Sequence, residues 1–201
     1  FQGILSILVS RRIISKHRMT LKDFNIDKTW TLFLDRDGVI NKRLENDYVK
    51  HPIDFEFLPG VLSSLKKLKD IFGKIVVVTN QQGIGKGLYR VEDLELIHKN
   101  MLYEVNYFGG KIDKIYFSPY LSSENHPSRK PGIGMAMEAK NDFPEIDLSK
   151  SVIVGDSLSD MEFGRNAGMK TVFIASNNTL VKYPQLFDIQ FESLEFFTDS
   201  L

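Results

Sequence analysis

The sequence predicts an α/β fold, a doubly wound parallel sheet with helices on both faces. Two patterns alternate along the chain: short apolar runs, and longer segments whose apolar residues recur at helical spacing. Short runs rich in β-branched residues are typical of strands that are buried on both faces. The chain has 201 residues, which is enough for one domain with a substantial core.

Six segments are expected to form strands. In chain order they are residues 30–34, 74–78, 111–117, 151–154, 171–174 and 187–191. The clearest is Lys74-Ile75-Val76-Val77-Val78, in which four β-branched residues follow one another. The last segment is expected at an edge of the sheet.

Five further segments are expected to be helical. They are residues 61–71, 94–105, 135–143, 161–167 and 194–197. The first follows a Pro59-Gly60 turn, and Leu65 and Leu68 lie on its apolar stripe. Strands that alternate with helices form parallel sheets, because each helix carries the chain back across one face.

The composition excludes several classes of protein. Lysine and arginine total 26, as do aspartate and glutamate, so the net charge of zero gives no reason to expect nucleic-acid or membrane binding. The chain has no cysteine, which excludes disulfides, iron–sulfur clusters, thiolate zinc sites and a cysteine nucleophile. No apolar run approaches the roughly 18 residues that span a bilayer. We expect a cytoplasmic monomer.

Residues 1–18 are expected to be a tag remnant or an N-terminal extension, and residues 19–201 a single domain. The apolar stretch 4–9 precedes its basic neighbours Arg11 and Arg12, which is the reverse of a secretory signal peptide. A membrane-surface amphipathic helix is the alternative for this segment.

Charged and hydroxyl side chains follow four of the expected strands. The residues concerned are Asp35, Asp37, Thr79, Arg129, Lys130, Asp156 and Asp160. Ligands of open α/β sheets bind beyond the carboxyl ends of the strands, so these side chains should meet at one edge. Carboxylates that gather in this way need a compensating cation, and magnesium prefers oxygen ligands. A metal site, cations and hydroxyl donors are the groups that phosphoryl transfer requires.

This constellation resembles the haloacid dehalogenase (HAD) superfamily of aspartate-nucleophile phosphatases. Its four motifs occur here in order: the Asp35-Arg36-Asp37-Gly38 box, Thr79, Lys130, and the box that runs from Gly155 to Asp160. The resemblance covers residues 31–174 and implies a Rossmann-like HAD core.

Within the superfamily, the sequence is similar to the D-glycero-D-manno-heptose-1,7-bisphosphate 7-phosphatases and to the histidinol-phosphate phosphatases. Arg36 between the two aspartates, and Asn80-Gln81 after the threonine, are particular to this group. Phe55-Glu56-Phe57-Leu58-Pro59-Gly60-Val61 and Arg129-Lys130-Pro131 also match it.

The resemblance implies a role for each matching residue. Asp35 is the expected nucleophile and Asp37 the general acid–base, while Thr79 holds the phosphoryl group. Lys130 offsets negative charge, and Asp160 orients it from the second shell of the site.

The implied ligands of magnesium are the Asp35 carboxylate, the Asp37 carbonyl and the Asp156 carboxylate. The resemblance implies that the substrate, a small phosphorylated sugar or polyol, is contacted by Asn80, Gln81, Arg129, Asp47 and Tyr48.

The loop at 118–128 departs from the heptose phosphatases. Most of them carry a structural zinc on a cysteine–histidine loop before the Arg-Lys-Pro motif, whereas this loop has His126 and no cysteine. A zinc site needs about four ligands, so no zinc is expected. His126 is read as a solvated loop residue, with substrate contact as the alternative, and His51 and His98 as surface residues. Ser157 stands where heptose phosphatases often have lysine.

No cap domain is expected. The segments between Asp37 and Thr79, and between the third strand and Lys130, are too short for a further domain of about 50 residues. The site should therefore be open, which disfavours a phosphomutase that must retain a bisphosphate. The glycines in Gly83-Ile84-Gly85-Lys86-Gly87 fail the nucleotide-loop patterns and are expected to form a flexible loop near the substrate.

The expected function is magnesium-dependent hydrolysis of a phosphomonoester, with the 7-phosphate of a heptose 1,7-bisphosphate as the favoured target. Histidinol phosphate or another small sugar or polyol phosphate is the alternative substrate. A phosphoacceptor signalling domain is a rival from another class, but its acceptor aspartate would follow the third strand, where Ser118 stands. A non-catalytic binding module is disfavoured because the acids, the threonine and the lysine are all present.

Overall fold

The computed structural model describes residues 20–175 and 184–201, so the expectations for residues 1–18 lie outside the described part. The described chain forms one six-stranded sheet in the order β3-β2-β1-β4-β5-β6, and every neighbouring pair is parallel. The strands are β1 (Thr31–Leu34), β2 (Lys74–Asn80), β3 (Lys114–Ser118), β4 (Ser151–Gly155), β5 (Lys170–Ile174) and β6 (Ile189–Phe191). The parallel α/β prediction is confirmed.

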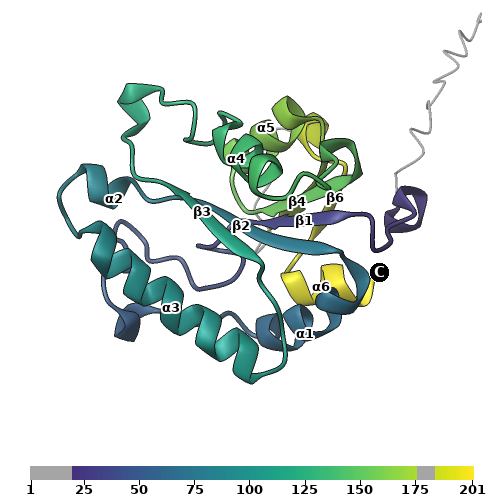
Figure 1. Ribbon diagram of the computed structural model, residues 1–201, viewed down its shortest axis with the longest axis horizontal. Coiled ribbons are helices and arrows are strands. Elements are labelled where there is room, and N and C mark those ends of the chain that lie inside the picture. The colour runs from purple at the N-terminus through teal and green to yellow at the C-terminus, as the bar shows by residue number, and fades with distance from the viewer. Residues whose placement is uncertain (1–19, 176–183) are drawn as a thin grey trace, which may run out of the picture.

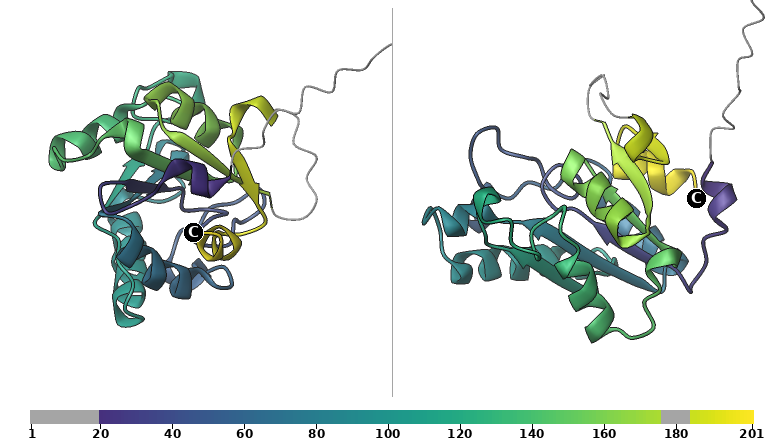
Figure 2. Two further views of the ribbon diagram at one scale, coloured as in Figure 1. Left: turned by 90° about the vertical axis from the view of Figure 1, so that its right-hand side faces the viewer. Right: turned by 90° about the horizontal axis from the view of Figure 1, so that it is seen from above.

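Helices cover both faces of this sheet (Figures 1 and 2). They are α1 (Val61–Ile71), α2 (Gln82–Gly85), α3 (Val91–Tyr107), α4 (Gly134–Asp142), α5 (Leu158–Ala167) and α6 (Leu194–Asp199). In Figure 1, α1, α3 and α6 lie below the sheet, and α4 and α5 lie above it. Short 3-10 turns at Leu21–Phe24, Pro52–Asp54, Ser122–Glu124, Leu148–Lys150 and Pro184–Leu186 complete the elements.

Each face of the sheet has its own hydrophobic core. Leu32 and Leu34 of β1 pack into the core on the α1 side, whereas Phe33 packs into the core on the α4 side. This alternation follows from the two-residue period of a strand. Because both faces are covered, every residue of β1 is buried, including Thr31 at its start.

Most element boundaries differ from the predicted ones by one to three residues. The third strand begins at Lys114 rather than at residue 111, and the edge strand β6 begins at Ile189 rather than at 187. The final helix extends to Asp199 instead of ending at 197. The predicted helix at 61–71 agrees with α1 at both ends.

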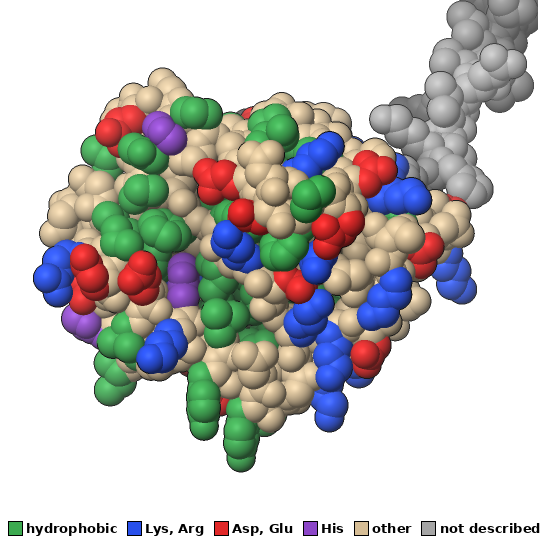
Figure 3. Space-filling model, in the orientation of Figure 1, with side chains coloured by type: hydrophobic (Ala, Val, Ile, Leu, Met, Phe, Trp, Pro, Cys, Tyr) green, Lys and Arg blue, Asp and Glu red, His purple; other side chains and the backbone are tan. Residues whose placement is uncertain are grey.

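The segments that follow β1 and β3 are loops with single 3-10 turns. Residues 35–60 join β1 to α1, and residues 119–133 join β3 to α4. No helix in the described residues has the length and apolar character needed to cross a membrane. Positive and negative side chains intermix over the face that Figure 3 shows, in keeping with the net charge of zero.

Candidate active site

The predicted site residues meet beyond the carboxyl ends of β1, β2 and β4. The amide of Asp35 donates to the carbonyl of Val154 at 2.9 Å, so the sheet hydrogen bonding continues past β1 and fixes the direction of Asp35. Carboxylate oxygens of Asp35, Asp156 and Asp160 all lie within 4.8 Å of one another. Residues far apart in the sequence thus form one acidic cluster, as the strand order requires.

Lys130 lies inside this cluster and is only 2% exposed. Its Nζ is 2.8 Å from Asp35 Oδ1 and 2.6 Å from Asp160 Oδ1, and it donates to the carbonyl of Val78 at 2.7 Å. Burial alone would lower the pKa of Lys130, but the two carboxylates outweigh it and raise that pKa. The lysine is therefore a buried cation at neutral pH.

Asp160 connects helix α5 to this lysine. Its Oδ2 accepts hydrogen bonds from the amide of Ser157 at 3.0 Å and from the Ser157 hydroxyl at 2.5 Å, at the N-terminus of α5. Its Oδ1 faces Lys130. Asp160 is fully buried, and the helix cap holds it in the position needed to orient the lysine.

Asp37 is surrounded by hydrogen-bond donors. Arg36 Nη2 donates to both of its oxygens at 2.9 Å, Asn41 Nδ2 donates at 3.0 Å and Gln81 Nε2 at 2.9 Å. Burial acts to raise the pKa of Asp37, but Arg36 and the amide donors together lower it. Asp37 is therefore ionised before a ligand binds.

Gln81, which is predicted to contact substrate, is buried and bonded to protein groups. Its side chain is 1% exposed, and its Nε2 donates to Thr79 Oγ1 at 2.8 Å as well as to Asp37. Its Oε1 accepts from the hydroxyl of Tyr89 at 2.5 Å. With every polar atom engaged inside the protein, Gln81 positions Asp37 and Thr79 relative to each other.

His98 was predicted at the surface, and that prediction is wrong. His98 is only 8% exposed and lies on the inner side of α3. There, Arg36 Nη1 is 3.2 Å from His98 Nε2. Burial, and then the charge of Arg36, lowers the pKa of His98 to about 3. The neutral imidazole therefore accepts from Arg36, which in turn holds Asp37. His51 is exposed, as predicted.

Because His98 is neutral in the folded protein, acid should destabilise the fold through this residue. The unfolded chain takes up a proton below about pH 6.5, whereas folded His98 does so only near pH 3. Unfolding free energy should therefore fall by about 1 kcal/mol per pH unit below pH 6.5 on account of His98.

The variant His98→Gln isolates this effect, since glutamine keeps an acceptor for Arg36 but does not titrate. Urea titrations at about pH 7 and pH 5 should show a smaller loss of stability for the variant than for the wild type. Equal losses in both proteins would show that His98 does not carry the acid sensitivity.

The predicted metal ligands point toward one spot. The Asp35 carboxylate, the Asp37 carbonyl and the Asp156 carboxylate all face the guanidinium of Arg43, whose Nη2 is 3.8, 3.0 and 2.7 Å from them. Burial and neighbouring carboxylates raise the pKa of Asp35 to about 6 and that of Asp156 to about 8. Three oxygen donors that converge on a place where positive charge is required fit a hard divalent cation.

Gly38 permits this convergence. Its φ is +96°, and a Cβ built on it would lie 1.9 Å from Asp156 Oδ2, so a side chain would displace that carboxylate. Gly38→Ala should cost about 2 kcal/mol or more of stability, from the left-handed backbone and the clash together.

Gly87→Ala is the matched control for this substitution. Its φ is +70° and an added Cβ meets nothing within 4 Å, so it carries the backbone cost without the clash. Thermal unfolding should show a larger loss for Gly38→Ala than for Gly87→Ala. Equal losses of stability would mean that the Asp156 carboxylate can move aside at no measurable cost.

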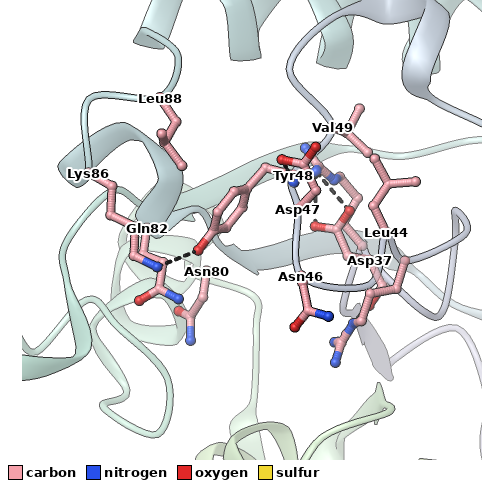
Figure 4. Close-up of a pocket in the computed structure, with 12 residues that line it drawn as sticks. Asp37, Leu44, Asn46, Asp47, Tyr48, Val49, Asn80, Gln82, Lys86 and Leu88 are labelled. Carbon is pink, nitrogen blue, oxygen red and sulfur yellow. Dashed lines mark hydrogen bonds and ion pairs between the residues drawn. The ribbon is translucent and has the colours of Figure 1, made fainter.

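A cavity of about 540 Å³ opens beside Asp37. Figure 4 shows Asp47 and Tyr48 on its wall, from the loop after β1, with Asn80 from the end of β2. Lys86 also lines it, and its Nζ donates to the hydroxyl of Tyr48 at 3.0 Å. The first part of the glycine-rich segment, which was expected to be a loop, lies in the short helix α2, and Lys86 directly follows that helix.

Arg129 and Asn80 are engaged with the loop that carries Lys130. Asn80 clamps the main chain of Lys130, with Nδ2 donating to its carbonyl at 3.1 Å and Oδ1 accepting from its amide at 3.0 Å. Arg129 Nη1 donates to the carbonyl of Tyr120 at 3.1 Å. His126 stacks on the Tyr120 ring at 3.5 Å between ring centres, so this histidine is held by packing.

Comparison of the sequence and the structure with known proteins identifies the family. Residues 24–195 match the family model described as polynucleotide kinase 3 phosphatase. A Mycobacterium tuberculosis protein named D-glycero-alpha-D-manno-heptose-1,7-bisphosphate 7-phosphatase is 42% identical over 137 residues, which are 68% of this chain and 72% of that protein. A Campylobacter jejuni protein of the same name is 40% identical over 149 residues, 74% of this chain and 84% of the relative.

A solved structure agrees with these relatives. The D,D-heptose 1,7-bisphosphate phosphatase from B. bronchiseptica, complexed with magnesium and phosphate, superposes with a TM-score of 0.77 at 30% identity. The match covers 85% of this chain and 96% of that one. The chain therefore belongs to the HAD superfamily of phosphatases, within the group that includes the heptose-1,7-bisphosphate 7-phosphatases.

Proposed function

We propose that this protein is a magnesium-dependent phosphomonoesterase that removes the 7-phosphate of a D-glycero-D-manno-heptose 1,7-bisphosphate through an aspartyl-phosphate intermediate. The observation that carries the proposal is the position of Asp35. It lies at the end of the central strand, 2.8 Å from the buried Lys130 and beside Asp37 and Asp156. The names of the relatives support the choice of substrate.

The first half of the reaction forms a phosphoenzyme. An oxygen of Asp35 attacks phosphorus, and the bond from phosphorus to the sugar oxygen breaks. Asp37 gives its proton to the departing alkoxide. The negative charge of a bound substrate's phosphate acts against the effect of the donors around Asp37 and raises the pKa of this carboxyl group. Asp37 therefore takes up a proton when the substrate binds.

The second half releases phosphate. Asp37, now ionised, takes a proton from water, and the oxygen of that water attacks phosphorus as the bond to Asp35 breaks. Lys130 and Thr79 face the charge on the phosphoryl oxygens. Magnesium held by the Asp35 carboxylate, the Asp37 carbonyl and the Asp156 carboxylate supplies positive charge that reduces repulsion between nucleophile and phosphate.

The cavity beside Asp37 would hold the rest of the sugar. Asp47, Tyr48 and Asn80 line it and offer hydrogen bonds to hydroxyl groups, while Lys86 offers positive charge. Arg129, on the loop that carries Lys130, is a second candidate cation for the substrate. The loops that border this cavity leave room for a substrate that extends away from its reacting phosphate. We expect the enzyme to act as a cytoplasmic monomer on this small substrate.

A substrate panel tests the proposal. Phosphate release should be measured for the α and β anomers of the heptose bisphosphate, histidinol phosphate, a polyol phosphate and a 3′-phosphorylated oligonucleotide. The heptose bisphosphates should give a kcat/KM at least about tenfold above the others, a difference of about 1.4 kcal/mol. Phosphorus NMR of the product should show the 1-phosphate retained.

Each other outcome has a definite meaning. A preference for histidinol phosphate or a polyol phosphate would replace the heptose, and a preference for the oligonucleotide would place the enzyme among nucleic-acid phosphatases. No magnesium-dependent turnover of any substrate would reject the enzymatic proposal in favour of a binding domain.

A further inference from the structure

Arg43 makes all of its polar contacts within the described residues at the metal-ligand cluster. Its Nη2 lies 2.7 Å from Asp156 Oδ1 and 3.8 Å from Asp35 Oδ2, and it donates to the Asp37 carbonyl at 3.0 Å. The charges of these groups outweigh partial burial and raise the pKa of the arginine. One guanidinium nitrogen thus contacts the same three groups, two carboxylates and one carbonyl, whose oxygens we assign as magnesium ligands.

The guanidinium and the metal cannot use these oxygens together. Magnesium holds its oxygen ligands at about 2.0–2.1 Å in an octahedral shell that demands near-ideal geometry. A nitrogen 2.7 Å from Asp156 Oδ1 stands inside the space that this shell needs. Two like charges this close would also repel each other strongly. Binding of the metal therefore requires that the arginine leave.

We propose that Arg43 is the internal counter-ion of the metal-free site and that magnesium binds by displacing it. This inference rests on the proposed function, because it takes the three oxygen sources to be the metal ligands. It assigns a positioning role to a residue outside the four motifs: Arg43 keeps Asp35 and Asp156 in place until the metal arrives.

The surroundings of Arg43 allow the exchange. Its side chain is 50% exposed and comes from the loop between Asn41 and Tyr48. The same side chain lines the cavity beside Asp37, together with Asp47 and Tyr48. A rotation of the side chain therefore carries the guanidinium from the carboxylates into solvent-filled space, where an anionic group of the substrate would meet it.

The proposal predicts a specific coupling between stability and metal affinity. If Arg43 stabilises only the metal-free state, its removal must weaken that state and strengthen magnesium binding by the same free energy. The contacts of Arg43 are those of a half-exposed ion pair with charge-assisted hydrogen bonds. Their loss should change the dissociation constant of magnesium about tenfold.

The experiment combines calorimetric titration with magnesium and thermal unfolding in chelator and in saturating magnesium. Arg43→Ala should bind magnesium about tenfold more tightly than the wild type, and its Tm should be lower in chelator but equal in magnesium. Arg43→Lys, which keeps the charge without the planar fork, should lie between the two.

Lys42→Ala is the matched control, because Lys42 is the neighbouring cation but pairs with Glu56 at the surface, at 3.4 Å. Its magnesium affinity should match that of the wild type, which separates displacement from a general change of charge. Unchanged affinity in Arg43→Ala, or a Tm deficit that persists in magnesium, would overturn the inference. Wild-type protein that binds no magnesium at all would instead overturn the proposed function.

Discussion

Replacing Asp35 with asparagine should lower kcat for phosphate release by at least about 10⁴-fold, since the amide cannot attack phosphorus or carry the phosphoryl group. Asparagine has nearly the size of aspartate, and it removes one of three clustered carboxylates whose repulsion helps raise the pKa of Asp35. The variant should therefore fold as well as the wild type. Steady-state assays with the preferred substrate, beside thermal unfolding, measure both properties.

Mass spectrometry of acid-quenched enzyme provides an independent measurement. The wild type should carry one phosphoryl group during turnover, on the peptide that contains Asp35, and Asp35→Asn should carry none. If the variant kept more than about 1% of the wild-type kcat, an effect under about 3 kcal/mol, Asp35 could not be the nucleophile. A direct attack by water would then replace the two-step reaction.

Replacing Lys130 with methionine should cost about 3–5 kcal/mol of stability near pH 8, because methionine fills the space but removes the buried cation that Asp35 and Asp160 share. The loss should shrink as the pH is lowered, since a carboxyl group that takes up a proton no longer needs a cation. Urea titrations at about pH 8 and pH 5.5 measure the difference.

Lys114→Met serves as the control for this effect. Lys114 pairs with Asp142 at 2.6 Å, a distance as short as that of Lys130 to Asp160, but both side chains are substantially exposed. Its removal should have a far smaller effect on stability than Lys130→Met at either pH, because solvent screens an exposed pair. If Lys130→Met were no worse than Lys114→Met, the buried lysine would not be needed to hold the two carboxylates, and its role would be limited to the reaction.

The fold could be predicted because its signals are local. Val76, Val77 and Val78 predict a buried strand from their own composition, and the apolar stripe around Leu65 predicts α1 with both of its ends. Polar residues at strand ends then fall at one edge of a parallel sheet by topology alone. The strand ends were less predictable, since the third strand depends on pairing with β2 rather than on its own residues.

The functions of individual polar side chains were harder to predict, because burial and partners are set by distant segments. Gln81 directly follows β2 and was expected to face substrate, but the hydroxyl of Tyr89 and the carboxylate of Asp37 enclose it. His98 has no sequence signal for a partner, and only the packing of α3 brings it to Arg36. Arg43 lies in an irregular loop, where no periodicity indicates which way a side chain turns.

During synthesis of the chain on a ribosome, the middle of the sheet is completed late. Strand β1 ends at Leu34, but the strand that flanks it on one side, β4, begins only at Ser151. Until then one edge of β1 lacks its partner and is open to association with other chains. Asp35 and Asp156 likewise come together only when most of the protein has been made. The emerging polypeptide therefore lacks the assembled carboxylate cluster, and one edge of β1 stays open to wrong association, until β4 docks.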